Sequence, residues 1–196
     1  MDDLETTRFH YGGNRSSSVS FIQFCSILER RPSSGKSEYL HDLYLIGEGP
    51  EWKENIAKPL LRNHGLSYFI PEDDSEDGYT SLCKSRVLLF VISENSRALT
   101  TMTRAAFAIG IKANIILCIQ SLRLNSEING CEKISQPAMH DYNRGRTYLM
   151  DLAKRNDIPV STDIEEAVLL AICKNHHDKS NSFNDNSTFT LLYPDV

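Results

Sequence analysis

The sequence predicts an α/β fold built as a three-layer, doubly wound sheet of about five mostly parallel strands. Short apolar runs rich in Ile, Leu and Val alternate with longer segments in which apolar residues recur every three or four positions. The runs are nearly continuous, which is typical of parallel strands covered by helices on both faces. Because crossovers between parallel strands are right-handed, few topologies fit, and we expect a flavodoxin- or Rossmann-like arrangement.

The 196 residues suit one domain with loose ends better than two domains. Residues 1–37 are acidic and then rich in Gly and Ser, so we expect a largely disordered segment, although 19–28 is apolar enough for a strand or short helix. The core domain is expected to span 38–177. Residues 178–196 are rich in Asn, Ser and Asp and predict a flexible tail, of which 188–193 could dock back onto the core.

The first half of the core is expected to contain a strand at 41–47, a helix at 50–64, a strand at 66–70, an acidic loop at 71–79 and a short helix to about residue 85. Pro50 and Glu51 suit the first turn of the helix, and Gly65 suits the left-handed position that ends it. Trp52 and Leu61 lie on its apolar side at helical spacing.

The second half is expected to contain strands at 86–93, 114–120 and 158–160, helices at 97–111 and about 139–156, and a last helix. Strand 86–93 is apolar enough to be buried on both faces. Thr162 and Asp163 would cap the last helix, whose end Lys174 and His176 would suit because cations favour that pole of the helix dipole. The inward positions expected in helix 139–156 are Tyr142, Tyr148, Leu149 and Leu152.

The composition argues against several classes of partner. The formal net charge is −5 and there is no long basic run, so neither DNA or RNA nor an anionic membrane is expected as a partner. The five cysteines are scattered and never spaced as CxxC, which argues against a zinc site and a disulfide framework. No signal peptide or apolar run of membrane-spanning length is present, so we expect a cytoplasmic protein, with the nucleus as an alternative, and neither metal nor cofactor.

In sheets of this kind, ligands bind where the strands end at their carboxyl edge. The first strand ends in Gly47, Glu48 and Gly49 before a helix begins, and glycines let a ligand approach the backbone. The alternative is a plain tight turn, because the pattern is not GxGxxG. The third strand ends before Glu94, Asn95 and Arg97. Glu94 could serve as a general acid or base or bind ribose hydroxyls, and the alternative is a solvated loop acid.

The next helix carries the sequence MTRAAFAIG at 102–110, directly before an apolar strand. Together with Tyr44, Gly47 and Pro50 at the start of the core and 158–160 near its end, this order resembles the nucleoside 2-deoxyribosyltransferases and related deoxynucleotide N-hydrolases. Their helix reads E-x-G-x-A-x-A-x-G-K, and Ala106, Ala108 and Gly110 match. The resemblance spans roughly residues 38–174 and is closest to the divergent animal branch that includes Raw-like proteins.

The resemblance breaks at the residues that carry the chemistry. Met102 stands where the family keeps its nucleophilic glutamate, and a thioether cannot form the glycosyl ester that this carboxylate forms. Arg104 replaces a small glycine, and an acid that precedes the nucleophile by about six residues would fall at Ser96. The resemblance places Tyr44 and Gly47 at the pocket floor.

We therefore expect a non-catalytic domain of this type that binds a nucleoside or nucleotide-like ligand, or a protein partner, in a regulatory or signalling role. The alternative is an active N-glycosidase or deoxyribosyltransferase that uses Glu94 as a displaced acid. A third reading is an interaction scaffold whose pocket Met102, Arg104 and Phe107 fill. The resemblance also implies a homodimer. The polar residues of helix 139–156 are expected to form a solvated face, with contact to a ligand or partner subunit as the alternative: Asp141, Asn143, Arg144 and Arg146.

Overall fold

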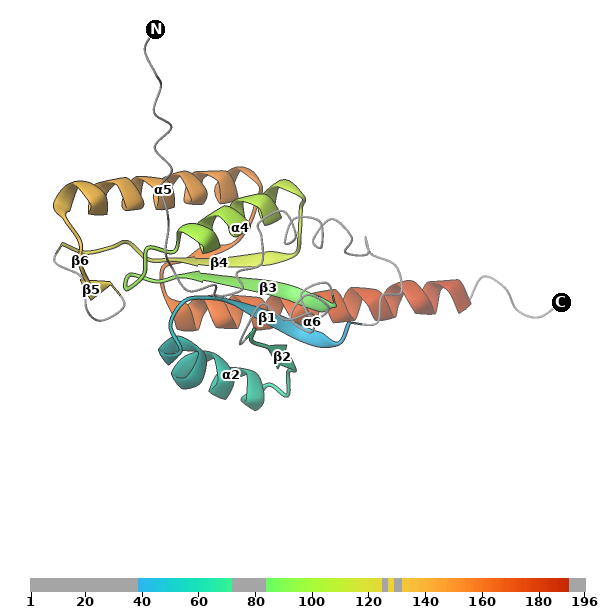
Figure 1. Ribbon diagram of the computed structural model, residues 1–196. Coiled ribbons are helices and arrows are strands. Elements are labelled where there is room, and N and C mark those ends of the chain that lie inside the picture. The colour runs from blue at the N-terminus through green and yellow to red at the C-terminus, as the bar shows by residue number, and fades with distance from the viewer. Residues whose placement is uncertain (1–38, 72–83, 125–126, 129–131, 191–196) are drawn as a thin grey trace, which may run out of the picture.

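The computed structural model describes residues 39–71, 84–124, 127–128 and 132–190, of which 132 and 181–190 are described by their backbone alone. Five parallel strands form the central sheet in the order β2-β1-β3-β4-β7, so the predicted doubly wound, flavodoxin- or Rossmann-like α/β fold is confirmed (Figure 1). The strands are β1 (His41–Gly47), β2 (Tyr68–Phe69), β3 (Ser85–Ile92), β4 (Ile115–Ile119) and β7 (Val160–Ser161).

Helices cover both faces of this sheet. One face carries α4 (Leu99–Gly110) and α5 (Gln136–Arg155), and the other carries α2 (Lys58–Asn63) and α6 (Ile164–Thr190) (Figure 1). A π-helical stretch, η1 (Lys53–Ala57), leads directly into α2. The predicted cap of the last helix is present, because Asp163 Oδ1 accepts a hydrogen bond from the Glu166 N–H at 2.8 Å.

The alternation of side chains along each strand divides the core into two clusters. Tyr44 and Ile46 of β1 face α4 and α5, whereas Leu43 and Leu45 face α2 and α6. The central strand β3 contributes to both clusters, and Val87 through Ile92 are all completely buried. The prediction that this strand is covered on both faces is therefore confirmed.

Several elements differ from the sequence prediction. The polar loop before α5 contains a two-stranded antiparallel sheet, β5 (Glu127–Ile128) and β6 (Glu132–Lys133). Helix α5 begins earlier than expected, because Ser135 caps it and a proline fills its first turn. Helix α6 continues to Thr190, so residues 178–190, expected as part of a tail, are helical.

Some predicted positions are corrected by this geometry. Lys174 and His176 lie within α6 and not at its end, so they cannot act on the terminal helix dipole. Tyr148 and Leu152 were expected in the core, but they are 65% and 37% exposed, because their side of α5 points away from the sheet.

Some expectations fall outside the described residues: the apolar segment 19–28, most of the acidic loop with its short helix, and the end of the tail beyond residue 190. Within the described ranges, none of the helices combines the length and the apolar character that crossing a membrane requires.

Candidate functional site

The strand order reverses between β1 and β3, because the chain moves from β1 to β2 on one side and returns to build β3, β4 and β7 on the other. Such a reversal separates the loops at the carboxyl edge and makes it the usual ligand position in this fold. The loops that follow β1 and β3 contain Glu48 and residues 93–98, respectively. The candidate site is therefore the carboxyl edge between these two strands.

Gly47 ends β1 in close contact with β3. A Cβ added at Gly47 would lie only 2.5 Å from the Val91 carbonyl oxygen, so a larger residue would push the two strands apart. Gly49 has a φ of +80°, which a side chain would strain. The Glu48 carbonyl oxygen between them accepts a hydrogen bond from Trp52 Nε1 at 3.0 Å. The glycines thus shape a tight turn that holds Glu48 at the strand end.

The side chain of Glu48 extends from the end of β1 to the loop that follows β3. Alternation along β1 places Tyr44 and Ile46 on the α4 and α5 side, and Glu48 continues this series. Its Oε2 accepts a hydrogen bond from Ser96 Oγ at 2.5 Å, and Ser96 is 2% exposed. Ser96 is the position where the resemblance would place an acid, so Glu48 brings a carboxylate to that position from another strand.

Arg146 of α5 forms hydrogen bonds with the loops at the carboxyl edge. It is completely buried, and its guanidinium donates to the carbonyl oxygens of Ser96 at 2.6 Å, Gln120 at 2.9 Å, and Ser93 and Tyr142 at 3.3 Å. Burial lowers the pKa of Arg146 from its ordinary value, and the negative charge of Glu48 acts in the opposite direction. The expectation of a solvated face is therefore wrong for Arg146.

A second carboxylate lies at the end of β3. Glu94 Oε2 forms an ion pair with Arg123 Nε at 2.7 Å, with side-chain exposures of 31% and 80%. The Glu94 N–H donates to Gln120 Oε1 at 3.3 Å, and Gln120 Nε2 donates to the Thr162 carbonyl oxygen at 3.2 Å. A backbone hydrogen bond to Gln120 and the ion pair with Arg123 thus hold Glu94 at the carboxyl edge.

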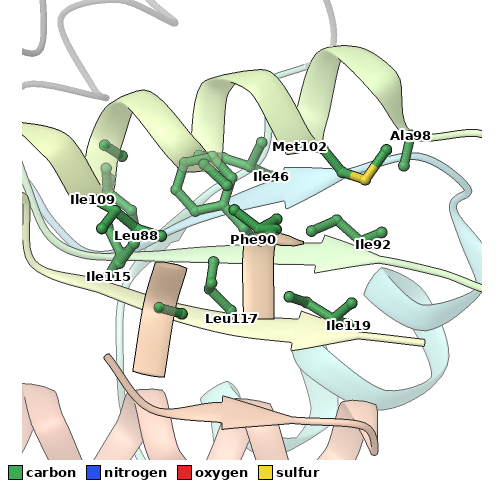
Figure 2. Packing of buried hydrophobic residues seen from close by; sticks show 14 of the residues in the cluster. Ile46, Leu88, Phe90, Ile92, Ala98, Met102, Ile109, Ile115, Leu117 and Ile119 are labelled. Carbon is green, nitrogen blue, oxygen red and sulfur yellow. The ribbon is translucent and has the colours of Figure 1, made fainter. Parts of the chain in front are cut away.

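Met102 is a core residue in the structure. It is 9% exposed, and its side chain points from the first turn of α4 toward the sheet, near Ala98 and Ile92 (Figure 2). A Cβ added at Gly145 of α5 would lie 3.8 Å from the Met102 methyl group, so this glycine leaves room for the thioether. The position that the resemblance assigns to a nucleophile is thus a residue of α4 that packs against α5 and β3.

The other predicted site residues are only partly brought together. Tyr44 is 7% exposed and stacks on Phe69, with ring centroids 5.5 Å apart, so it is part of the core below the edge. Asn95 is exposed in the loop after β3, and Arg97 is half-buried in the same loop. Arg104 is half-buried in α4, one residue before the buried Ala105.

Two residues of α5, Asn143 and Arg146, were assigned to a solvated face by sequence reasoning but are not exposed, and for Arg146 the spacing signalled burial. Arg146 lies seven residues after Met139 and three before Leu149, which are both buried. Asn143 is half-buried and exchanges two hydrogen bonds with the backbone of Leu122, at 2.8 and 2.9 Å. Asp141 and Arg144 do lie on an exposed face, as expected.

Chemically, the described edge offers two carboxylates, a glutamine amide and the exposed guanidinium of Arg123. Such groups suit the binding of a small polar ligand through its hydroxyl and amide groups. Within the described ranges, no cluster of three or more His, Cys, Asp or Glu residues is arranged to hold a metal ion.

Comparisons with known proteins add no identification. No protein-family model matches the chain, and no match was found among curated proteins or solved structures.

Proposed function

We propose that this chain is a non-catalytic domain of the nucleoside 2-deoxyribosyltransferase-like type, which binds a nucleoside or nucleotide and does not cleave it. The observation that carries the proposal is the contrast between the buried Met102 and the polar carboxyl edge beside it. The thioether is buried in the core, whereas the carboxyl edge beside it keeps Glu48, Ser96 and Glu94 as polar groups at the switch point.

The loss of the attacking carboxylate is the reason for proposing binding without chemistry. Retaining glycosyl transfer requires a nucleophile positioned at the anomeric carbon, and a neutral thioether cannot replace a carboxylate there. Glu48 and Glu94 are held by Ser96 and Arg123, respectively. Each carboxylate can still accept a hydrogen bond from a sugar hydroxyl, because a carboxylate offers about four lone-pair directions.

The proposal is tested by offering the full chain a panel of nucleosides and nucleoside monophosphates, in ribose and deoxyribose forms. Thermal unfolding reports binding, and chromatography of the same mixtures reports any released base. A ligand present at about 100 times its Kd adds about 2.7 kcal/mol, which raises Tm by roughly 5–10 °C for a chain of this size. We expect such a shift for at least one member, with no base released.

Variants connect the binding to the site. Glu94→Gln and Glu48→Gln should each weaken the binding about tenfold, because a charge-assisted hydrogen bond to the sugar is lost. Asp157→Asn is the matched control, since it is the same acid-to-amide change at an exposed position near the opposite edge of the sheet. Base release that Glu94→Gln abolishes would identify an active N-glycosidase instead. No shift with any member at millimolar concentration would favour a protein-binding scaffold.

A further inference from the structure

Two histidine rings lie close together on the surface where α2 ends beside α6. His64 follows the last residue of α2, and His176 lies within α6. Their ring centroids are 6.4 Å apart, and the ring planes are inclined by 56°. Both residues are exposed, so an ion from the solvent can reach the two imidazoles.

The backbone under each ring is held in place by the fold. The Gly65 N–H donates to the Arg62 carbonyl oxygen at 3.0 Å and, with a φ of +64°, closes the end of α2 directly after His64. Leu61 of α2 and Ile172 of α6 belong to the same core cluster, which fixes the two helices relative to each other. The backbone positions of the two histidines are therefore set, and the side chains alone are left to rotate.

The spacing of the two rings suits one metal ion between them. Two imidazoles that share a tetrahedral ion, each with a nitrogen about 2.0–2.1 Å from the metal, have ring centroids roughly 5 Å apart. The observed 6.4 Å is slightly longer, and rotation of two exposed side chains can close this gap without moving the backbone. Imidazole nitrogen suits Zn²⁺, Cu²⁺ and Ni²⁺, whereas Mg²⁺ and Ca²⁺ prefer oxygen ligands.

We propose that His64 and His176 bind one divalent transition-metal ion of the zinc class, which joins the end of α2 to α6. Among the residues that the structure describes, no third His, Cys, Asp or Glu is grouped with them for this purpose. Water would therefore fill the remaining positions of the ion, and the binding should be weaker than in a closed structural site with four protein ligands.

The surroundings of the pair are compatible with a cation and separate from the candidate functional site. Lys179, one turn further along α6 than His176, is paired with Asp42 at 2.6 Å, so its positive charge is offset. Asp42 lies at the beginning of β1, which places this part of α6 at the amino edge of the sheet. Glu48 and Glu94 lie at the carboxyl edge, where the strands end.

The experiment is titration of the full chain with Zn²⁺, followed by calorimetry and by NMR of the carbon-bound imidazole protons. One ion should bind per chain, and the signals of His64 and His176 should shift together with the same saturation curve. Thermal unfolding should move to higher temperature with Zn²⁺, because the ion binds the folded state, in which the two rings are adjacent. Mg²⁺ at the same concentration should leave these signals in place.

Variants assign the binding to the pair. His64→Asn and His176→Asn should each weaken Zn²⁺ binding at least about tenfold, since loss of a group that merely orients a metal ligand already costs about 10–100-fold. His177→Asn is the matched control, because it is the same change about 100° further around α6, where the ring lies 3.8 Å from Asp178. Cys173→Ser controls for the exposed thiol one turn before His176. Both controls should leave the affinity unchanged, and circular dichroism verifies that each variant is folded.

Three results would overturn the proposal. The first is a wild-type chain that binds no Zn²⁺ at millimolar concentration, and the second is binding that His64→Asn and His176→Asn both retain. The third is a loss in either control as large as the loss in His64→Asn, which would assign the ion to other residues. The titration contains no nucleoside or nucleotide, so its outcome is independent of the proposed function.

Discussion

At the scale of single residues, the proposed absence of glycosidase chemistry depends on the side chain at position 102. Replacing the buried Met102 with glutamate would put a carboxyl group among Ile92, Ala98 and Leu149. We expect Met102→Glu to destabilise the fold by about 3 kcal/mol, because a buried carboxyl group without partners loses its hydration. It should not create glycosidase activity.

The measurement is chemical denaturation, together with the base-release assay. Met102→Leu serves as control, since it keeps the volume and polarity and should cost less than about 1.5 kcal/mol. If Met102→Glu were as stable as wild type, the carboxylate would have reached solvent, and the assignment of this position to the core would be wrong.

Two cysteines should differ sharply in reactivity. Cys118 of β4 is completely buried, and burial, together with the negative charges of Asp163 and Glu166, raises its pKa to about 12. Cys173 of α6 is exposed. Because the thiolate is the reactive form, a short iodoacetamide pulse at pH 8 should modify Cys173 and spare Cys118 until the protein is unfolded. Peptide mapping by mass spectrometry reads both sites, and rapid native labelling of Cys118 would contradict this.

Residue-level prediction from sequence succeeded where residue type and spacing agreed. Leu149 and Trp52 are apolar, lie at helical spacing in their helices and are buried. It failed where the two disagreed. Arg146 was assigned to the solvent because it is charged, and Tyr148 to the core because it is aromatic. Their spacing from the buried Leu149 instead places Arg146 in the core and Tyr148 on the surface. The core tolerates the charged guanidinium of Arg146 because carbonyl oxygens at several loop ends accept its hydrogen bonds.

At the scale of elements, Arg146 joins α5 to the loops that follow β3 and β4. Arg146→Lys should destabilise the fold by about 3 kcal/mol, because one ammonium cannot reach the carbonyl oxygens of Ser93, Ser96 and Gln120 together. Amide hydrogen exchange of residues 93–98 should accelerate as well. Arg144→Lys, two residues away on the exposed side, should change stability by less than about 0.5 kcal/mol. Equal effects of the two variants would refute the role of Arg146.

At the amino edge of the sheet, where the strands begin, an ion pair joins β1 to α6. Asp42 Oδ1 lies 2.6 Å from Lys179 Nζ, and its Oδ2 accepts from Ser67 N–H at 2.9 Å and from Ser67 Oγ at 3.0 Å. Burial alone would raise the pKa of Asp42, but Lys179 and Ser67 outweigh it, so the pKa lies below its ordinary 3.8. The carboxylate therefore stabilises the fold above the unfolded-state pKa, and this contribution is lost as pH falls through the lower folded-state pKa.

Asp42→Asn should accordingly be less stable than wild type at pH 7, with a difference that stays constant down to about pH 5 and closes below about pH 4. Denaturation midpoints measured from pH 7 to pH 3 provide the comparison. Lys179→Met removes the same pair from the other side and should show the same closing difference. A gap that persists unchanged at pH 3 would show that the charge of Asp42 is irrelevant.

The order of elements was predictable, but their fine structure was not. The cap at Asp163 and the stop at Gly65 follow from local residue chemistry. The π-helical stretch η1 and the small β5–β6 sheet were not predicted, because neither segment carries a capping residue or an apolar run that marks such an element. The end of α6 was misplaced because polar residues after 178 favour a loop by composition, although the helix continues through them.

At the scale of the whole molecule, the apolar strands determine both the class of fold and the place of the site. Continuous burial along β3 requires helices on both faces, and a doubly wound sheet then has a switch point where its order reverses. Sequence could place Glu48 and Glu94 at strand ends on this basis. It could not predict that Glu48 reaches Ser96, because that contact depends on the relative height of two strands that are far apart in sequence.

The shared strands should also make the two halves of the core unfold together. Trp52, the single tryptophan, lies on the α2 and α6 side, whereas Leu149 packs on the α4 and α5 side. Leu149→Ala should lower the free energy of unfolding by about 2–4 kcal/mol, because it leaves a cavity in the core. Since Val87 through Ile92 contribute to both clusters, neither helical layer can detach without exposing β3. Trp52 fluorescence and far-ultraviolet circular dichroism should therefore report the same lowered midpoint in denaturant, with an unchanged slope.

Leu169→Ala, at a position 39% exposed on α6, should shift both probes far less, although it lies on the same side as Trp52. A variant at Leu149 that lowers the dichroism midpoint and leaves the fluorescence midpoint in place would show that the two faces of the sheet unfold independently.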